Sequence, residues 1–403
     1  MESTVCHSPT LLLLLLLISL PVFHSLPTKS GYLPVNASTG SAIFYAFYEV
    51  QKPIFPASKT PLLIWLQGGP GCSSMIGNFF ELGPWRVNFQ KAKNDPLALE
   101  PNSGSWNRHF GLLFLDNPIG TGFSVASTPA EIPRDQFSVA KHLFAAITSF
   151  IRLDPVFNSR PIYIAGESYA GKYVPAIGYY ILKKNAQLPA SEQVNLAGVA
   201  IGNGLTDPLT QVTTHAVNAY FSGLIDEKQK RELEKAQWEA VRLTKSRNWT
   251  EARNARIRVI SLLGDMTGLA TLYDFTRKFP SKTELVSELL QNEELKKALG
   301  VNKAVVFEEC SDVVRDALLD SDVMKSTKYM VEFLVKKSKV LLYQGHFDLR
   351  DGVVSTEAWM KTMKWEGIED GVLSGYVKKW KSLTHVVVLG ARHFVPADQA
   401  LNS

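Results

Sequence analysis

Short apolar runs that end at, or within two residues of, Gly, Pro or Asn recur along the chain. They lie at residues 62–66, 112–115, 162–165, 199–201, 340–343 and 386–389. Buried strands have this length and composition. Helical patterns lie between the runs, as from Asp135 to Phe150, where apolar residues recur at spacings of three and four. Strands that alternate with helices predict an α/β fold with a mostly parallel central sheet flanked by helices.

The alternation breaks between about residues 207 and 301, where the sequence is charged and helix-periodic and contains no convincing strand. This change predicts a helical insertion, or lid, within one α/β core. We therefore divide the chain into a signal peptide at 1–25, a first part of the core at 26–206, the insertion at 207–301 and a second part of the core at 302–403.

The N-terminus carries ten consecutive Leu, Ile or Ser residues, Leu11 to Leu20, followed by Pro21. A secretory signal peptide has an apolar region of this length, whereas a membrane-spanning helix needs about 20 residues. A retained signal anchor is the alternative. No later segment is long and apolar enough to span a bilayer, so we expect a mature protein that is secreted or vacuolar, with no membrane contact after signal removal. Asn36 and Asn248 each begin an Asn-x-Ser/Thr glycosylation pattern, which agrees with that compartment.

The chain has 43 Lys and Arg residues against 38 Asp and Glu residues. The most basic stretch, 228–258, contains interspersed glutamates like a solvated helix face, so we expect no nucleic-acid partner. Neither zinc-ligand spacing nor a phosphate-binding glycine loop is present, so no cofactor and no metal are predicted. With Cys6 in the signal peptide, Cys72 and Cys310 remain, either as one disulfide across a long loop or as two buried thiols.

The turn after residues 162–165 has the sequence Gly166-Glu167-Ser168-Tyr169-Ala170-Gly171 and leads into a helical pattern. A sharp strand-to-helix turn lifts a serine hydroxyl clear of the backbone, and small flanking residues let strand and helix approach. Ala170 replaces the second glycine of the general pattern, so a purely structural turn is the alternative. We predict that Ser168 is a nucleophile.

A serine nucleophile needs a histidine to take its proton and a carboxylate to orient that histidine. Asp348 follows the run 340–343, and His393 follows the run 386–389. The order Ser, Asp, His is that of α/β-hydrolases. Spacing alone leaves Asp351 open in place of Asp348, and His346 or His385 in place of His393; because His385 precedes its predicted strand, a structural role is expected for it.

Acyl transfer also requires backbone N–H groups aimed at the oxyanion of the tetrahedral intermediate. The glycines of Gln67-Gly68-Gly69-Pro70-Gly71 follow the run 62–66 and allow close approach of the backbone to a ligand. We predict the amides of Gly69 and Tyr169 as the two donors. A tight turn without a catalytic part is the alternative explanation of these glycines.

Ordered motifs along residues 31–399 resemble the serine carboxypeptidase family, most of all its plant serine carboxypeptidase-like members. They are the segments 65–74, 79–84, 115–124, 166–171, 201–204 and 393–399. The resemblance implies an α/β-hydrolase fold with a helical insertion over the site, a Ser168–Asp348–His393 triad, and a disulfide between Cys72 and Cys310.

The family holds the free carboxylate of a peptide C-terminus through residues of the first motif and two glutamic acids. The matching positions here are Gln67, Gly68, Glu81 and Glu167. Two adjacent carboxyl groups resist ionising together, so at acidic pH they keep protons and can donate hydrogen bonds to the substrate carboxylate. The resemblance thus implies a secreted serine carboxypeptidase that acts on peptide or protein C-termini at acidic pH.

Two departures keep other functions open. Gln67 stands where the family usually has Asn, and only residues 400–403 follow the last motif, where we expect family members to continue for another helix. An acyltransferase that uses sugar-ester donors and the same triad is one alternative, although such enzymes tend to have Asp where this chain has Glu167. A secreted non-catalytic homologue that acts by binding is the other.

Overall fold

A computed structural model describes residues 26–88, 90–91, 98–364 and 377–400. The signal peptide predicted for residues 1–25 lies outside the described residues. Within them, no helix is both long and apolar enough to cross a membrane.

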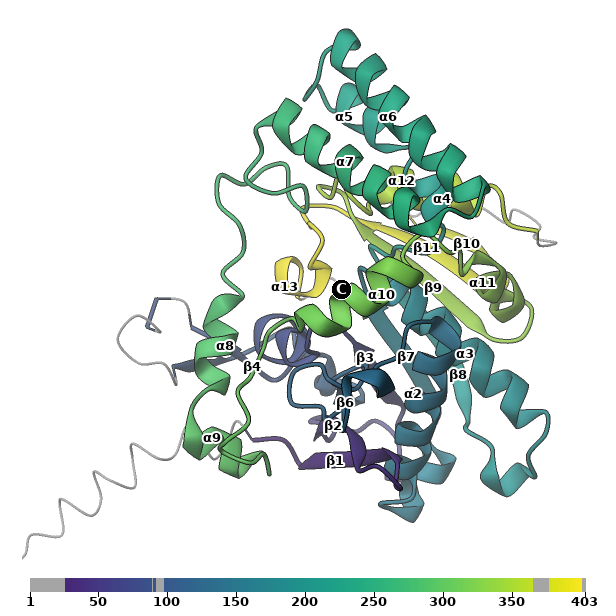
Figure 1. Cartoon of the computed structure of the whole chain (residues 1–403). Helices are drawn as coiled ribbons and strands as arrows, with labels where there is room; N and C mark the ends of the chain where they lie inside the picture. The colour runs from purple at the N-terminus through teal and green to yellow at the C-terminus, as the bar shows by residue number, and fades with distance from the viewer. Residues whose placement is uncertain (1–25, 89, 92–97, 365–376, 401–403) are drawn as a thin grey trace, which may run out of the picture.

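A nine-stranded sheet forms the centre of the molecule (Figure 1), with the strand order β1-β2-β6-β3-β7-β8-β9-β11-β10. In this order, the neighbouring strands β6, β3, β7, β8, β9 and β11 pair in parallel. Strands β1 and β2 on one side and β10 on the other pair in antiparallel fashion. The strands are β1 (Lys29–Asn36), β2 (Ser41–Tyr48), β3 (Leu62–Leu66), β6 (Gly111–Leu115), β7 (Ile162–Glu167), β8 (Leu196–Gly202), β9 (Lys339–Gly345), β10 (Val377–Trp380) and β11 (Leu383–Val388), with a separate hairpin of β4 (Trp85–Val87) and β5 (Leu99–Pro101).

Helices cover both faces of the sheet, as expected for a largely parallel sheet. They are α2 (Gln136–Ile151), α3 (Ala170–Asn185), α4 (Pro208–Gln211), α5 (His215–Phe221), α6 (Glu227–Lys245), α7 (Trp249–Thr267), α8 (Glu284–Leu290), α9 (Glu293–Ala298), α10 (Asp312–Ser321), α11 (Lys328–Val335), α12 (Val353–Met360) and α13 (Val395–Asp398), besides a π-helical turn at Gly77–Leu82. Short 3₁₀ turns lie at 57–59, 106–108, 129–131, 155–159 and 190–192.

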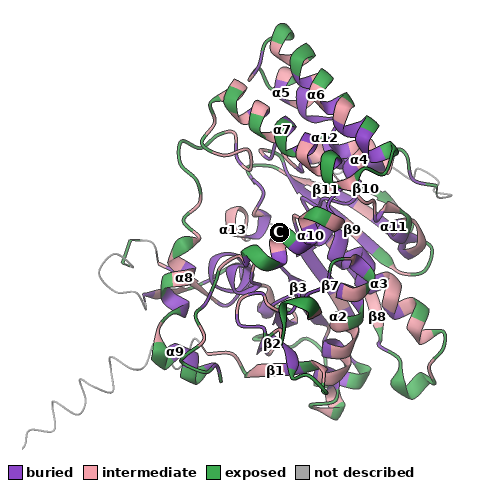
Figure 2. Ribbon diagram, viewed as in Figure 1, coloured by how far each residue is buried: buried purple, intermediate pink, exposed green. Residues whose placement is uncertain are grey.

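Alternation along the strands divides the core into two layers. Leu62 and Ile64 of β3 face α2 and α3, whereas Leu63 and Trp65 face the turn Gly77–Leu82 and α8. Buried residues fill the inner strands β2, β3 and β6, and exposed residues lie on the outer sides of α6 and α7 (Figure 2). The sheet is therefore held between two apolar layers. The ends of its strands are not covered by these layers and can carry the polar residues of a site.

The structure confirms the predicted α/β class, and each predicted strand is present within a few residues of its expected bounds. One placement was wrong, because β11 begins at Leu383 and so includes His385 instead of starting after it. The antiparallel strands β1 and β2 were not predicted; β2 carries apolar or aromatic side chains on both faces and is not followed directly by Gly, Pro or Asn.

The region 207–301 is helical throughout its regular structure, with no strand among its residues. In Figure 1, α5, α6 and α7 stack together at the top of the view, while α8 and α9 lie lower, beside the sheet. Helices α6 and α7 share the apolar cluster of α2 and α3, whereas α8 and α9 pack in the cluster of β2, β3 and β6. The boundaries of core and insertion stay a prediction.

A disulfide joins Cys72, after β3, to Cys310, before α10. The pairing implied by the family resemblance is thus present, and the alternative of two free thiols was wrong. The bond ties the glycine-rich loop after β3 to a segment 238 residues further along the chain.

Candidate active site

The carboxyl ends of four neighbouring strands carry the polar residues of the candidate site. Ser168 follows β7, Asn203 follows β8, Asp348 follows β9 and His393 follows β11. Because these strands are parallel and adjacent, their following loops meet at one edge of the sheet.

Ser168 lies in a sharp turn between β7 and α3 with a positive φ of 61°. This left-handed conformation is uncommon for a residue with a side chain and persists only where the surroundings enforce it. Here the Ser168 N–H donates to Gly202 O at 3.0 Å, and the Ser168 carbonyl accepts from the N–H groups of Gly171 and Leu205, each at 2.9 Å. The neighbouring strand therefore helps to hold the turn.

His393 and Asp348 are both buried and joined side chain to side chain. His393 Nδ1 lies 2.7 Å from Asp348 Oδ2. The backbone N–H groups of Arg350 and Asp351 donate to the other oxygen, Asp348 Oδ1, at 2.7 and 3.1 Å. A carboxylate with both oxygens occupied in this way fixes the orientation of the imidazole.

The alternative partners lie elsewhere. Asp351 is buried beside Arg350 and makes no hydrogen bond to His393. His346 is exposed. His385 is buried in β11, its Nε2 lies 2.5 Å from Gln344 Oε1, and burial lowers its pKa to about 4. The geometry therefore favours Asp348 and His393 over these residues.

The loop after β3 packs directly against the turn that carries Ser168, which we call the nucleophile turn after its predicted role. A Cβ atom on Gly68 would lie 2.6 Å from both the carbonyl oxygen of Glu167 and the backbone nitrogen of Tyr169, so only glycine fits. The N–H groups of Gly69 and Tyr169 were predicted to point at an oxyanion. Among the backbone hydrogen bonds that loops and turns make in the described residues, none is donated by either group. No hydrogen bond joins Ser168 to His393 in the described part of the chain; in enzymes without substrate this contact is often long and tightens on binding.

A pair of carboxylic acids lies beside this turn. Glu81, from the turn Gly77–Leu82, and Glu167, which immediately precedes Ser168, are both fully buried. Gln67 Nε2 donates to Glu167 Oε1 at 2.7 Å, and Gln67 Oε1 accepts from Trp65 Nε1 at 2.9 Å. The indole thus orients the amide so that its NH₂ group faces the pair.

The pair favours protons over ionisation. Burial raises the pKa of Glu81 to about 8, and burial followed by the charge of Glu81 raises the pKa of Glu167 well above its usual range. Both oxygens of Glu81 and Oε2 of Glu167 have no donor in hydrogen-bonding geometry within the described residues. Because buried acceptors without donors are costly, this arrangement favours the protonated form of a carboxyl group, which brings its own O–H donor.

Two supporting residues have roles that the sequence did not assign. Asn203 donates from Nδ2 to Asp348 Oδ2 at 2.7 Å and accepts from the Gly345 N–H at 2.9 Å. Arg392, next to His393, pairs with Asp398 of α13 and lies 3.7 Å from Asp274. Asn203 stands in a motif that the family resemblance includes, and an asparagine directly after a strand was the available sign of its role.

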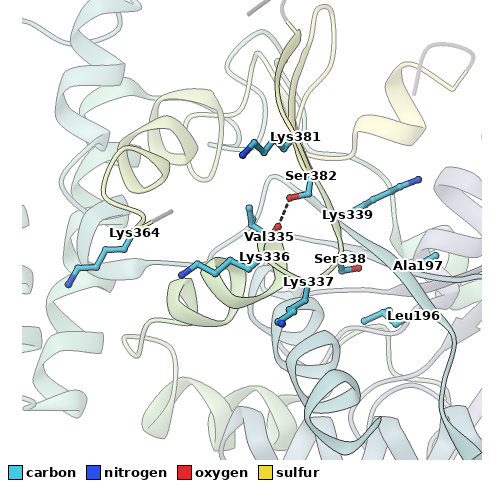
Figure 3. A pocket seen from close by; sticks show the side chains of 10 residues that line it. All are labelled: Leu196, Ala197, Val335, Lys336, Lys337, Ser338, Lys339, Lys364, Lys381 and Ser382. Carbon is cyan, nitrogen blue, oxygen red and sulfur yellow. Dashed lines mark hydrogen bonds between the residues drawn. The ribbon is translucent and has the colours of Figure 1, made fainter. Parts of the chain in front are cut away.

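A separate hollow of about 1070 Å³ opens at the opposite ends of β8, β9 and β11. Figure 3 shows Lys336 and Lys339 at this hollow pointing away from each other, so their ammonium groups do not converge on one ligand. Its place at the amino ends of parallel strands separates it from Ser168. In the described ranges, no group of three or more His, Cys, Asp or Glu side chains is placed to hold a metal ion.

Comparisons with known proteins agree on one family. A family model described as serine carboxypeptidase matches residues 21–403. Serine carboxypeptidase-like 50 of Arabidopsis thaliana is 58% identical over 398 residues, covering 95% of this chain and 87% of the relative. A probable serine carboxypeptidase of Dictyostelium discoideum is 33% identical over 392 residues, covering 92% and 76% of the two chains.

The fold agrees with this match. The crystal structure of a prohormone-processing carboxypeptidase from Saccharomyces cerevisiae superimposes with a TM-score of 0.80 at 26% identity, covering 92% of this chain and 88% of that one. The chain therefore belongs to the serine carboxypeptidase family and is a serine-type carboxypeptidase with an α/β-hydrolase fold.

Proposed function

We propose that this protein removes C-terminal residues from peptides through a Ser168–His393–Asp348 triad and an acyl-enzyme. The observation that carries the proposal is the buried acid pair Glu81–Glu167, which adjoins the nucleophile turn. A protonated pair beside the nucleophile binds a free carboxylate, and this favours attack on the last peptide bond of a chain.

In the proposed mechanism, Ser168 Oγ attacks the carbonyl carbon of that bond while His393 takes the hydroxyl proton. The N–H groups of Gly69 and Tyr169 stabilise the oxyanion. His393 then gives the proton to the leaving amine, which departs as a free amino acid. Water, deprotonated by His393, attacks the acyl-enzyme and releases the shortened peptide, while Asp348 holds the imidazole in one tautomer.

The substrate carboxylate is held by hydrogen bonds from Gln67, from the protonated Glu81–Glu167 pair and from the backbone of Gly68. The pair donates only while it holds protons, which favours action at acidic pH. Gln67 is committed to Glu167 and Trp65 in the structure, so the amide is oriented before substrate arrives. We infer that the extra methylene of Gln67, relative to the usual Asn, is accommodated in this way.

An acidic, oxidising compartment suits these features. We propose that residues 1–25 direct the chain into the secretory pathway, that 207–301 is an insertion in one hydrolase core, and that the mature protein is secreted or vacuolar. The Cys72–Cys310 disulfide supports an oxidising environment. Asn248 is exposed and Asn36 is half-buried at the end of β1, and we propose both as glycosylation sites.

Labelling with a small fluorophosphonate, followed by intact-mass measurement, tests the nucleophile. We expect one adduct on the wild type, none on Ser168→Ala, and one on the control Ser222→Ala, which changes an exposed serine. Before labelling, the same wild-type preparation should release single amino acids from a peptide with a free C-terminus. It should release none from the same peptide with a C-terminal amide. Absence of an adduct on folded wild-type protein refutes the triad; an adduct with acyl transfer to an added alcohol in preference to water supports an acyltransferase instead.

A further inference from the structure

The chain leaving helix α7 crosses the two loops that carry Asp348 and His393. Three backbone hydrogen bonds join residues 272–275 to these loops: Leu349 N–H to Leu272 O at 3.0 Å, His393 N–H to Tyr273 O at 3.2 Å, and Phe275 N–H to Phe347 O at 3.2 Å. We call residues 272–275 the crossing segment. It links the two loops through a third part of the chain.

Tyr273 is the residue of the crossing segment that contacts the imidazole. Its ring centroid lies 4.3 Å from that of His393, with the ring planes inclined at 45°. Arg350 Nη1 donates to the Tyr273 hydroxyl at 2.6 Å, and the guanidinium carbon of Arg350 lies 5.0 Å from the same ring. The backbone N–H of Arg350 in turn donates to Asp348 Oδ1. Tyr273 thus contacts the histidine and is bonded to the loop of the aspartate.

The hydrogen bond to Asp348 fixes the imidazole at one nitrogen only. Rotation about that contact would still swing Nε2, the atom that must reach Ser168, out of line. An aromatic ring packed on the imidazole restricts this rotation, and the Arg350 contact restricts the ring itself. A displacement of about 1 Å at a reacting group can cost about 10²-fold in rate.

We propose, on the basis of the function proposed above, that Tyr273 is a positioning residue that holds His393 in its productive orientation. It acts through the imidazole and does not need to touch the substrate. Because the crossing segment follows α7 within a few residues, the same contact connects the helical insertion to the general base. A shift of α7 therefore has a direct route to the orientation of His393.

Steady-state kinetics on three variants tests this role. Tyr273→Leu removes the ring, Tyr273→Phe keeps the ring and loses only the hydrogen bond from Arg350, and Phe275→Leu is the matched control. Phe275 is half-buried on the same segment, but its ring packs on Phe347, at 5.5 Å between centroids. We expect kcat to fall about 10- to 10²-fold in Tyr273→Leu with KM within about 3-fold of wild type, partial recovery in Tyr273→Phe, and near wild-type kcat in Phe275→Leu.

A second readout does not depend on peptidase activity. The proton of the His393–Asp348 hydrogen bond is expected as a strongly deshielded NMR resonance, which should broaden or shift in Tyr273→Leu and persist in Phe275→Leu. If Tyr273→Leu does not fold, Tyr273→Met, whose longer and more flexible side chain adapts better to the space of the ring, replaces it.

Wild-type kcat in Tyr273→Leu with an unchanged resonance overturns the proposal, and so does a loss no larger than that of Phe275→Leu. A rise in KM alone also overturns it, because that result assigns Tyr273 to substrate binding. If wild type fails to label with fluorophosphonate, the triad proposal fails, while the resonance still decides whether Tyr273 positions the imidazole.

Discussion

Replacing Glu81 by Gln tests the role in substrate binding that we propose for the buried acid pair. Wild type offers a protonated pair below the pKa of Glu81, which is about 8, and a negatively charged one above it. If the proposed role is right, a peptide carboxylate binds the protonated pair and is repelled by the charged one. Above the pKa of Glu81, the fraction of enzyme with a protonated pair falls tenfold for each pH unit. We therefore expect KM to rise as pH increases through neutrality, and to approach a tenfold rise per pH unit above the pKa.

The side-chain amide introduced by Glu81→Gln cannot ionise, so this variant should flatten the rise. The assay is KM for a peptide with a free C-terminus, measured between about pH 5 and 9, with the same peptide as its amide for comparison. Glu232→Gln, which changes an exposed carboxylate on α6, is the matched control and should keep the wild-type profile. A wild-type KM that stays flat over this range refutes the argument, and so does an equal rise in Glu81→Gln.

The same pair predicts how stability depends on pH. The folded pKa of Glu81, about 8, lies above its ordinary value of 4.5, so between these limits the native state binds more protons than the unfolded state. Stability due to this group is therefore present at acidic pH and is lost as pH rises through the folded pKa. The limiting slope is about 1.4 kcal/mol per pH unit for one proton. Denaturant unfolding of Glu81→Gln should show a shallower fall than wild type.

Two other perturbations test the support of the site. Asn203→Leu removes the amide that donates to Asp348 and accepts from Gly345, so we expect kcat to fall about tenfold or more with little change in KM. Asn195→Leu, before β8, serves as the control. Equal kinetics in the two variants would count against an orienting role of Asn203. Paired Cys72→Ser and Cys310→Ser substitutions open a loop of 238 residues and should lower the free energy of unfolding, measured in denaturant, by up to ~5 kcal/mol. An unchanged unfolding midpoint would show that the loop after β3 does not depend on the disulfide.

The sequence predicted the elements whose composition is set by burial alone. Residues 62–66 coincide with β3, because a central parallel strand is apolar on both faces and a glycine-rich turn ends it. The edge strands β1 and β10 were not predicted, because their composition is not set by burial on both faces. β1 contains Pro34 and polar residues, and β10 has the sequence Val-Lys-Lys-Trp, so neither carries the buried pattern.

The residues of the candidate site could be proposed from the sequence, whereas the contacts that hold them in place could not. Ser168, Asp348 and His393 follow strands, and their order along the chain is recognisable without coordinates. Tyr273 follows no strand and belongs to no motif, and its contact with His393 arises because the chain leaving α7 happens to cross two loops distant in sequence. Gly345 is similar, since a Cβ there would lie 1.8 Å from Arg392 O, a restriction that only the packed loops impose.

Burial is the main cause of the raised pKa of Glu81 and Glu167, and the ion pairs around the two residues do not reverse it. Arg392 is the cation whose charge reaches Glu81, and it is already committed to Asp398 and Asp274. Asp398 acts on Glu81 in the opposite direction and raises its pKa, whereas Arg392 lowers it. A pair of acids kept for stability would be expected to face a free cation, because buried charge without a partner is costly. Here the cation that acts on Glu81 is paired with Asp398 and Asp274, and this arrangement agrees with the proposal that the pair keeps its protons to bind a carboxylate.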